Sequence, residues 1–288
     1  MEILTQIPQL VVNGLMSGAI LAVPAIAFSL IFAVLQISNF SVAAHVAIGA
    51  YAAFVANTVF GLPAAAAVVA AFVVSGAIGV VSDHLALRPL RGQGPLTVAI
   101  TSMALNMVLE NVVRFGFGND VRGLDIPIYR DWILGPVHIA PQQFFNFLIA
   151  AIVTAALFCL LAFTPIGKAM RAVADNPKLA DIKGINPEQI ARLAIFIGMG
   201  LAGVGGVLVA LQSGIEPTIG FRIILSVFAA AVLGGLGNIL GAVAGALTIG
   251  VAEELSLLAL PDAYRSAVGF VAIIVALLFF PRGILGKR

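Results

Sequence analysis

Charged residues are scarce in this sequence. Asp, Glu, Lys and Arg make up 10% of its 288 residues and hydrophobic residues 61%, with a mean hydropathy of +1.12. Because soluble domains carry roughly a quarter of charged residues, this composition excludes a soluble protein and indicates a polytopic membrane protein. The formal net charge of +2 gives no basis for a nucleic-acid partner.

Cysteine and catalytic motifs are also lacking. Cys159 is the single cysteine, so the chain can form neither an internal disulfide nor a cysteine-based metal site. The sequence contains no GxxxxGK[ST] phosphate loop, no HExxH and no GxSxG, motifs that bind nucleotide phosphates or support hydrolysis. We therefore expect no catalytic residue, no metal and no cofactor in this chain, which cannot hydrolyse ATP by itself.

No Lys or Arg precedes Arg88. The positively charged start of a cleaved signal peptide is therefore missing, and we expect the chain to insert through its own spans and to stay in the membrane. About 20 apolar residues are needed to cross the hydrocarbon core of a membrane. Apolar stretches near this length lie at 8–35, 41–60, 63–86, 95–117, 143–163, 190–212 and 266–281, and a further apolar block lies at 223–252.

This pattern predicts one all-α membrane domain, residues 1–288, with about eight transmembrane helices. The first span contains Gly14, Gly18 and Pro24, so it could be kinked, tilted or broken. The block at 223–252 is interrupted by Gly-Gly-Leu-Gly-Asn at 234–238. We predict a re-entrant or broken segment there, with its break near the middle of the membrane, since irregular backbone is tolerated only where protein or water covers it.

Basic residues predict the orientation, because they favour cytoplasmic loops. Ten of the fifteen lie in three segments: the loop after the third span, the stretch 164–192 and the C-terminus. If all three segments lie on the cytoplasmic side, the N-terminus and the loop 118–142 lie outside. A hairpin at 223–252 that enters and leaves from the outer side keeps this count consistent. The ten residues are Arg88, Arg91, Lys168, Arg171, Lys178, Lys183, Arg192, Arg282, Lys287 and Arg288.

The stretch 164–192 reads TPIGKAMRAVADNPKLADIKGINPEQIAR and carries a third of all basic residues. Thr164-Pro165 and Asn176-Pro177 have the residue types that begin helices, and Gly184 the type that ends them. Two short surface helices are therefore predicted. They could dock in a groove of another protein, or they could form an ordinary interfacial loop whose basic residues meet lipid headgroups.

The quoted stretch GKAMRAVADNPKLADIKGIN resembles the cytoplasmic coupling segment of permease subunits of ABC importers of the branched-chain amino acid (Leu/Ile/Val) type. The resemblance extends over nearly the whole chain. NGLMSGAILAVPAIAFSLIFAVLQISNF and IGAYAAF are similar to the first two spans of that family. AAAVLGGLGNILGAVAGALTIGVAEEL and LLFFPRGILG are similar to its late glycine-rich segment and its C-terminal signature.

The resemblance implies a set of partners. These are a second permease, two cytoplasmic ATPases that use ATP and Mg, and a periplasmic or extracellular solute-binding protein. The second permease is expected to be a paralogue rather than an identical copy. It also implies that the segment 164–192 contacts an ATPase through Gly167, Ala169, Arg171, Ala172, Ala180, Gly184 and Ile185. After the first span, however, Asn39-Phe40 is followed by Ser-Val-Ala-Ala-His instead of the family's glycine–acid pair, so the family name alone does not identify the solute.

Polar residues inside spans are costly and need a reason. His45 could line the pathway or simply bond to a neighbouring backbone. Asn106 and Glu110 share a helix face and could face the pathway, or Glu110 could pair with Arg114. Glycines at the break could expose helix ends to a solute or could serve close packing. The pathway candidates are Asn39, His45, Asn106, Glu110, Gly234, Gly235, Gly237 and Asn238.

The sequence therefore predicts a multi-pass permease subunit of an ABC importer in the bacterial cytoplasmic membrane. Its expected solute is a branched-chain or related amino acid; urea, amides, sugars and carboxylic or aromatic acids remain alternatives. A self-sufficient secondary transporter or channel is a more distant alternative and would need no ATPase. An intramembrane enzyme would show turnover that depends on one polar residue, such as His45 or Glu110.

Overall fold

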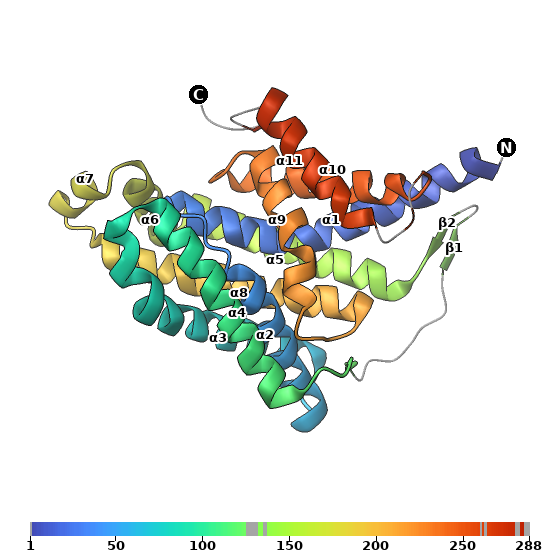
Figure 1. The fold of residues 1–288 in the computed structure, drawn as a ribbon, viewed down its shortest axis with the longest axis horizontal. Helices are drawn as coiled ribbons and strands as arrows, with labels where there is room; N and C mark the ends of the chain where they lie inside the picture. The colour runs from blue at the N-terminus through green and yellow to red at the C-terminus, as the bar shows by residue number, and fades with distance from the viewer. Residues whose placement is uncertain are drawn as a thin grey trace.

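The computed structural model describes residues 2–124, 132–134, 137–259, 261, 264–279 and 283–284. Within them the chain is an elongated bundle of helices with one small β-hairpin (Figure 1). The first half contains α1 (Glu2–Leu35), α2 (Val42–Phe54), α3 (Ala64–Ser82), α4 (Pro95–Phe117) and the strands β1 (Trp132–Leu134) and β2 (Val137–Ile139). The second half contains α5 (Pro141–Phe163), α6 (Pro165–Asp175), α7 (Pro177–Ile182), α8 (Pro187–Ser213), α9 (Ile219–Gly234), α10 (Ile239–Ser256) and α11 (Arg265–Phe279).

Short stretches of tighter or wider helix extend two of these elements. A π-helical turn, Val55–Val59, continues α2, and a second one, Asp83–Leu87, followed by a 3₁₀ turn, Arg88–Gln93, continues α3. Five helices begin with proline at the first position, where its missing N–H is not needed and its fixed φ suits a helix. These prolines are Pro95, Pro141, Pro165, Pro177 and Pro187.

The described residues contain seven helices that are long and apolar enough to cross a membrane, at Ile7–Leu35, Val42–Val59, Ala64–Gln93, Pro95–Phe117, Pro141–Phe163, Pro187–Ser213 and Ile239–Ser256. Two shorter apolar helices, Ile219–Gly234 and Ala267–Phe279, accompany them. The prediction of an all-α polytopic membrane protein is confirmed. The spans predicted from hydropathy alone agree with these helices to within a few residues at most ends.

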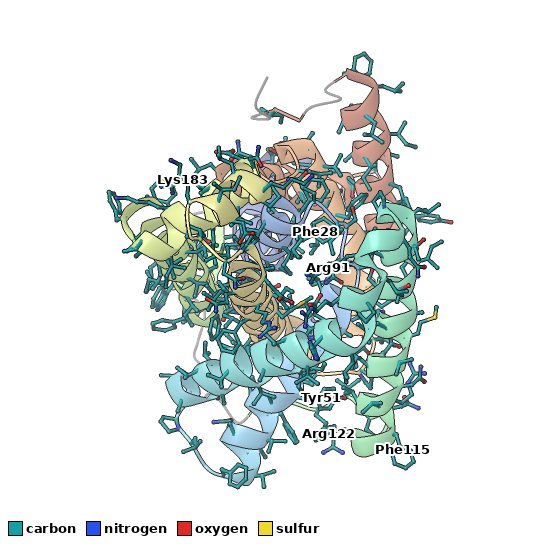
Figure 2. All side chains as sticks on the ribbon, turned by 90° about the vertical axis from the view of Figure 1, so that its left-hand side faces the viewer. Phe28, Tyr51, Arg91, Phe115, Arg122 and Lys183 are labelled. Atoms are coloured by element: carbon teal, nitrogen blue, oxygen red, sulfur yellow. The ribbon has the colours of Figure 1, made fainter. Side chains whose placement is uncertain are left out.

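Burial separates central from peripheral helices. In the most hydrophobic windows of α1 and α8, 83% of residues are buried, whereas the corresponding share is 28% for α3 and 22% for α4 and α5. Helices α1, α2 and α8 thus form the centre of the bundle. The exposed apolar side chains of α3, α4 and α5, such as Phe115 at 95% exposure, belong to its outer surface (Figure 2).

Close backbone approach holds the centre together. A Cβ atom added at Gly49 on α2 would lie 2.2 Å from Gly203 Cα on α8, and one at Gly206 would lie 1.9 Å from the carbonyl oxygen of Val46. On the opposite side of α1, a Cβ at Gly14 would lie 2.6 Å from Val251 Cα on α10. Lipid offers no hydrophobic driving force between helices, so small residues that permit such contact are the main source of packing energy.

The block predicted at 223–252 is a helical hairpin, α9 and α10, joined by a turn at 235–238. The break is where the glycines predict it, and its turn lies near the C-terminal end of α1. The turn packs beside Ser29 and Ala33, within the last two turns of α1, because α10 runs antiparallel to α1 over most of its length. The helices of 16 and 18 residues are about 24 and 27 Å long, so the hairpin reaches nearly through the bundle.

Two further features of the first half bear on the predictions. Helix α1 is continuous from Glu2 to Leu35 although it contains Pro8 and Pro24, so, of the three alternatives for the first span, a break is excluded. The loop 118–142 includes the antiparallel pair β1–β2, with Trp132 opposite Ile139, which is too short to give a periodic signal. The charged residues of this loop at 125, 130 and 131, like the basic residues at 282, 287 and 288 that were counted for the orientation, lie outside the described residues.

Replacing Gly49 with Ala should destabilise the bundle, because the added methyl group meets backbone atoms that cannot rotate away. We expect a cost of about 1–3 kcal/mol, as for overpacked cores, seen as a lower midpoint of thermal unfolding in detergent. Gly116→Ala is the matched control, since no atom lies within 4 Å of a Cβ added at this helical position. Equal midpoints for the two variants would contradict the close-packing account.

Candidate coupling surface and translocation site

The segment 164–192 folds as predicted into two short helices, each with its own side-chain cap. The Thr164 hydroxyl accepts from the Gly167 N–H at 3.1 Å and begins α6, and Asn176 Oδ1 accepts from the Leu179 N–H at 3.0 Å and begins α7. Gly184 ends α7 with a φ of +84°, a conformation that favours glycine. Asn186 then caps α8 by accepting from two backbone N–H groups. The helices therefore have sharply defined ends.

Helix α6 lies against the bundle with one face. Met170 and Val173 are 1% and 4% exposed and join the main core, whereas Lys168 and Arg171 lie on the exposed face. A Cβ at Gly167 would lie 2.2 Å from the carbonyl oxygen of Leu161, and the Arg171 guanidinium donates to the same carbonyl. The start of α6 is thus fixed to the end of α5.

The seven predicted coupling residues divide by exposure. Gly167 and Ala180 are buried, and Ala169, Ala172 and Ile185 are half-buried against the core. Arg171 and Gly184 are exposed. Most of these seven residues therefore shape and support the double helix from within, and only two present atoms at its outer surface.

Three apolar residues that the sequence reasoning missed are exposed in the same segment. Ile182 is 81% exposed, Leu179 53% and Ile166 41%. Leu179 and Ile182 are three residues apart on α7 and share a face, with Lys178 and Lys183 beside them. An apolar pair in an otherwise charged stretch is the signal that could have identified them, because neighbouring exposed apolar side chains, unlike single scattered ones, mark contact sites.

Ion pairs join separate elements at the end of the bundle where α6 and α7 lie. Arg88, in the 3₁₀ turn before α4, pairs with Glu188 at the start of α8, and Arg91 pairs with the largely buried Asp83 at 2.5 Å. The basic loop after α3 therefore lies at the same end as α6 and α7, as its charge predicts. Figure 2 looks onto this end, with Lys183 on the outer edge and Arg91 nearer the centre.

Two predicted pathway residues, Asn39 and His45, are buried at the start of α2. Asn39 Oδ1 accepts from the Ser41 N–H at 3.1 Å and the Ser41 hydroxyl at 2.7 Å, and His45 Nδ1 lies 2.8 Å from the Ser41 carbonyl oxygen. Asn39 Nδ2 and His45 Nε2 have no partner among the described residues. Since unpaired buried polar atoms are rare, both atoms have capacity for a water molecule.

Helix α4 carries the other two polar candidates. Asn106 is 5% exposed, and its Oδ1 atom has no partner within the described part of the chain. Glu110 accepts from Arg114 Nη2 at 3.0 Å, which is the ion pair that the sequence offered as the alternative to a pathway role. These four side chains thus lie on or just before two neighbouring helices, α2 and α4, and three of them are buried; the fifth polar candidate, Asn238, lies in the turn between α9 and α10.

The backbone N–H groups of Gly235 and Gly237, at the turn between α9 and α10, both have acceptors. The Gly237 N–H donates to the Ser29 hydroxyl at 3.1 Å, and the Gly241 N–H donates to Asn238 Oδ1 at 3.1 Å. The Gly235 N–H donates within α9, and the Ile284 N–H donates to the Leu233 carbonyl at 2.8 Å. A pathway role for Gly234, Gly235 and Gly237 would therefore rest on their small size and not on free N–H groups.

Two adjoining cavities lie at the end of the bundle opposite α6 and α7. One has a volume of about 340 Å³ and polar walls, and the other a volume of about 450 Å³ and apolar walls. Both lie within the about 300–1,000 Å³ range of small-molecule sites. None of the eight predicted pathway residues lines either cavity. Across the described ranges, no cluster of three or more His, Cys, Asp or Glu side chains could hold a metal ion.

Within the described ranges, seven membrane-length helices around a glycine-packed centre, with a capped double helix projecting from one end, define a multi-pass membrane protein. Comparison with known families makes this specific. Residues 10–277 match the model of the family described as branched-chain amino acid transport system / permease component, and the chain belongs to this family.

Individual relatives agree over most of their length. The chain is 33% identical to the high-affinity branched-chain amino acid transport system permease protein BraD of Pseudomonas aeruginosa, over 97% of this chain and 95% of BraD. It is 32% identical to LivH of Escherichia coli, a permease protein of the same description, over 96% of this chain and 94% of LivH. A shorter match, 30% identical over 59% of this chain and 50% of the relative, is to the ribose import permease protein RbsC of E. coli.

Removing the α7 cap should loosen that helix alone. Asn176→Ala deletes the acceptor of the Leu179 N–H, a loss of about 1 kcal/mol for a typical cap. We expect about fivefold faster hydrogen exchange of the α7 amides and unchanged exchange in α6 and α8. Asn111→Ala is the control, because its side chain only donates within α4. Unchanged exchange in α7 would show that the cap does not stabilise it.

Proposed function

We propose that this chain is one half of the translocation pathway of an ABC importer that brings a branched-chain or related amino acid into the cell. Family membership and the similarity to BraD and LivH over more than nine tenths of their length support this solute over ribose, since RbsC matches only half of its own length. The single observation that carries the mechanism is the projecting double helix α6–α7. A second permease, a paralogue of this one, completes the pathway.

The α6–α7 end faces the cytoplasm in this proposal. The basic residues gathered there follow the positive-inside rule, and the loop at Arg88 joins the same end through its ion pair with Glu188. Cytoplasmic ATPases that bind ATP and Mg then have access to Leu179 and Ile182. The opposite end, where the two cavities lie, faces the solute-binding protein.

The double helix is suited to transmit movement because both its ends are anchored. The Arg171–Leu161 contact joins α6 to α5, and the Asn186 cap joins the segment to α8, a central helix. A displacement of α7 by an ATPase would therefore reach α5 and α8 together. Those two helices supply walls of both cavities, so the ATPase cycle can open and close them. The permease itself contributes shape and no bond chemistry.

The proposal is tested by reconstituting the chain with the second permease, the ATPases and the binding protein encoded beside it. We expect uptake of leucine, isoleucine or valine into proteoliposomes that requires ATP and the binding protein. Uptake by this chain alone, driven by an ion gradient, would instead support a secondary transporter. ATP-dependent uptake of another solute alone would retain the transporter class and overturn the amino-acid assignment.

Placing a charge on the exposed face of α7 should uncouple the ATPases. Ile182→Asp puts a carboxylate at the most exposed apolar residue of the segment, and we expect at least a tenfold loss of ATP-driven uptake and weaker co-purification of the ATPases, as for a contact hot spot.

Val121→Asp is the matched control, because Val121 is 65% exposed at the other end of the bundle. Both variants should keep the thermal stability of the unmodified chain. Normal uptake by Ile182→Asp would exclude α7 as the docking element.

A further inference from the structure

The apolar cavity of about 450 Å³ lies between three helices. Its walls come from residues within 64–68 of α3, 142–149 of α5 and 207–211 of α8, together with Asn57 and Leu124. Helices α3 and α5 belong to the periphery of the bundle, and α8 belongs to its centre. The cavity is thus bounded by two peripheral helices and one central helix.

The walls of this cavity are almost entirely hydrocarbon. Small and aliphatic side chains and one aromatic ring, that of Phe145, make up most of them, and no charged side chain is among the described lining residues. The side-chain amides of Asn57, Gln142 and Asn146 each donate to a backbone carbonyl, at 3.0, 2.8 and 3.5 Å respectively. Because a buried water molecule needs several polar partners and apolar cavities stay dry, this cavity suits a hydrocarbon group better than water or a polar solute.

The cavity reaches the outer surface between α3 and α5. Ala65 and Phe145 line it and are themselves exposed. Within the described residues, α3 packs mainly on α8 and α2 and α5 mainly on α1, and α3 and α5 are not closely packed on one another. Apart from Cys159, every exposed residue of these two helices is apolar, as expected of faces that contact lipid tails. The mouth of the cavity therefore faces the hydrocarbon of the membrane.

The position of the cavity along the helices places it in one leaflet. Its lining residues fall within the first five residues of α3 (64–68) and the first nine of α5 (141–149), which rise about 7 and 13 Å. The hydrocarbon core of a membrane is about 30 Å thick, so the cavity lies in the half opposite α6 and α7. In the orientation proposed above, this half is the outer leaflet.

We propose that the apolar cavity binds an acyl chain of an outer-leaflet phospholipid, which enters between α3 and α5 and lies against α8. An empty apolar cavity forfeits the dispersion contacts of its walls, and the abundant apolar molecule at its mouth is a lipid tail. The volume of about 450 Å³ is roughly three times that of an apolar cavity that takes up one benzene molecule. It therefore has room for most of one acyl chain.

A lipid in this position bears on the movement of α5 against α8, and this part of the inference rests on the proposed function. The amides of Gln142 and Asn146 join α5 to α8 at the cavity wall, and the other end of α5 is fixed to α6 through Arg171. When the ATPases displace α6 and α7, the cavity changes width. A flexible acyl chain can follow this change and keep the walls in contact, so the bound lipid lowers the resistance to the movement that coupling requires.

The experiment uses the complete transporter in lipid nanodiscs that contain phosphatidylethanolamine with a photoreactive diazirine in the middle of one acyl chain. We expect light-induced attachment at Val207 or Leu211 of α8. Val207 is 3% exposed, so a lipid tail reaches it only through the cavity. Val204, also 3% exposed and not a lining residue, is the matched control and should stay unlabelled. Attachment confined to exposed residues of α3 and α5, such as Ile152, would overturn the proposal.

A pair of variants tests the route of entry. Ala65→Phe places a ring in the mouth of the cavity and should abolish attachment at Val207 and Leu211. Its control is Val69→Phe, four residues along α3 and 62% exposed, a position that does not line the cavity; it should be labelled like the unmodified chain. Both variants should keep the midpoint of thermal unfolding, since both positions are exposed. Equal attachment in the two variants would contradict entry between α3 and α5.

Two further results would assign the cavity to another occupant. Attachment at Val207 in the chain alone that disappears in the complete transporter would indicate a side chain of the second permease. Attachment that excess leucine prevents would indicate the transported solute. Either result would overturn the lipid site.

The effect on transport is measured separately. Ala65→Phe should lower the maximal rate of ATP-dependent uptake about threefold at unchanged KM, because it acts on a conformational step and not on solute binding, whereas Val69→Phe should not. Lost attachment with an unchanged rate would refute the role of the lipid in transport. Attachment requires no solute, so it tests the lipid site even if the unmodified transporter imports another solute, a result that would refute only the solute of the proposed function.

Discussion

Contact between helix backbones is the constraint on which this structure depends. In lipid, neighbouring helices gain nothing from hiding apolar surface, so close packing of their backbones becomes a main source of their association, together with hydrogen bonds between helices. The contact of Gly49 with Gly203 joins α2 to α8 within the centre, and the contact of Gly14 with the backbone at Val251 joins α10 to α1. The peripheral helices have large exposed apolar side chains and fewer such contacts. The bundle is therefore rigid at its centre and faces lipid or partners at its edge.

The same constraint explains the α9–α10 hairpin. A turn inside a membrane protein must satisfy its own backbone groups, and at the turn 235–238 the Gly235 N–H donates to Val232 of the preceding helix and the Gly237 N–H donates to Ser29. Gly235, with a φ of +101°, permits the sharp change of direction. Because the turn lies at the end of α1, α9 and α10 can pack along the neighbouring helices over nearly their whole length.

Much of this fold could be predicted from the sequence because membrane helices are encoded locally. Apolar length indicates the spans, and Thr164, Asn176 and Asn186 indicate where the short helices begin. The depth of the hairpin turn could not be predicted, since it depends on how far α10 runs along α1, a contact between residues more than two hundred positions apart. The β1–β2 pair was missed because three-residue strands carry no period.

The candidate sites also differ in how far the sequence could predict them. The coupling segment was predictable as a segment, but its outward side chains were not, because exposure of Leu179 and Ile182 depends on which face of each short helix meets the bundle. The paired cavities left no signal in the sequence. Gln142, Asn146 and Glu254 read as ordinary polar residues near span ends, and only the packing of α1, α5, α8 and α10 brings them to one wall.

The ion pair between Arg88 and Glu188 has a consequence for folding. It joins the 3₁₀ turn after α3 to the start of α8, two points one hundred positions apart in the chain. Helices α4 to α7 and the β1–β2 pair lie between them in the sequence. The end of α3 can therefore obtain this partner only after all of those elements have been synthesised.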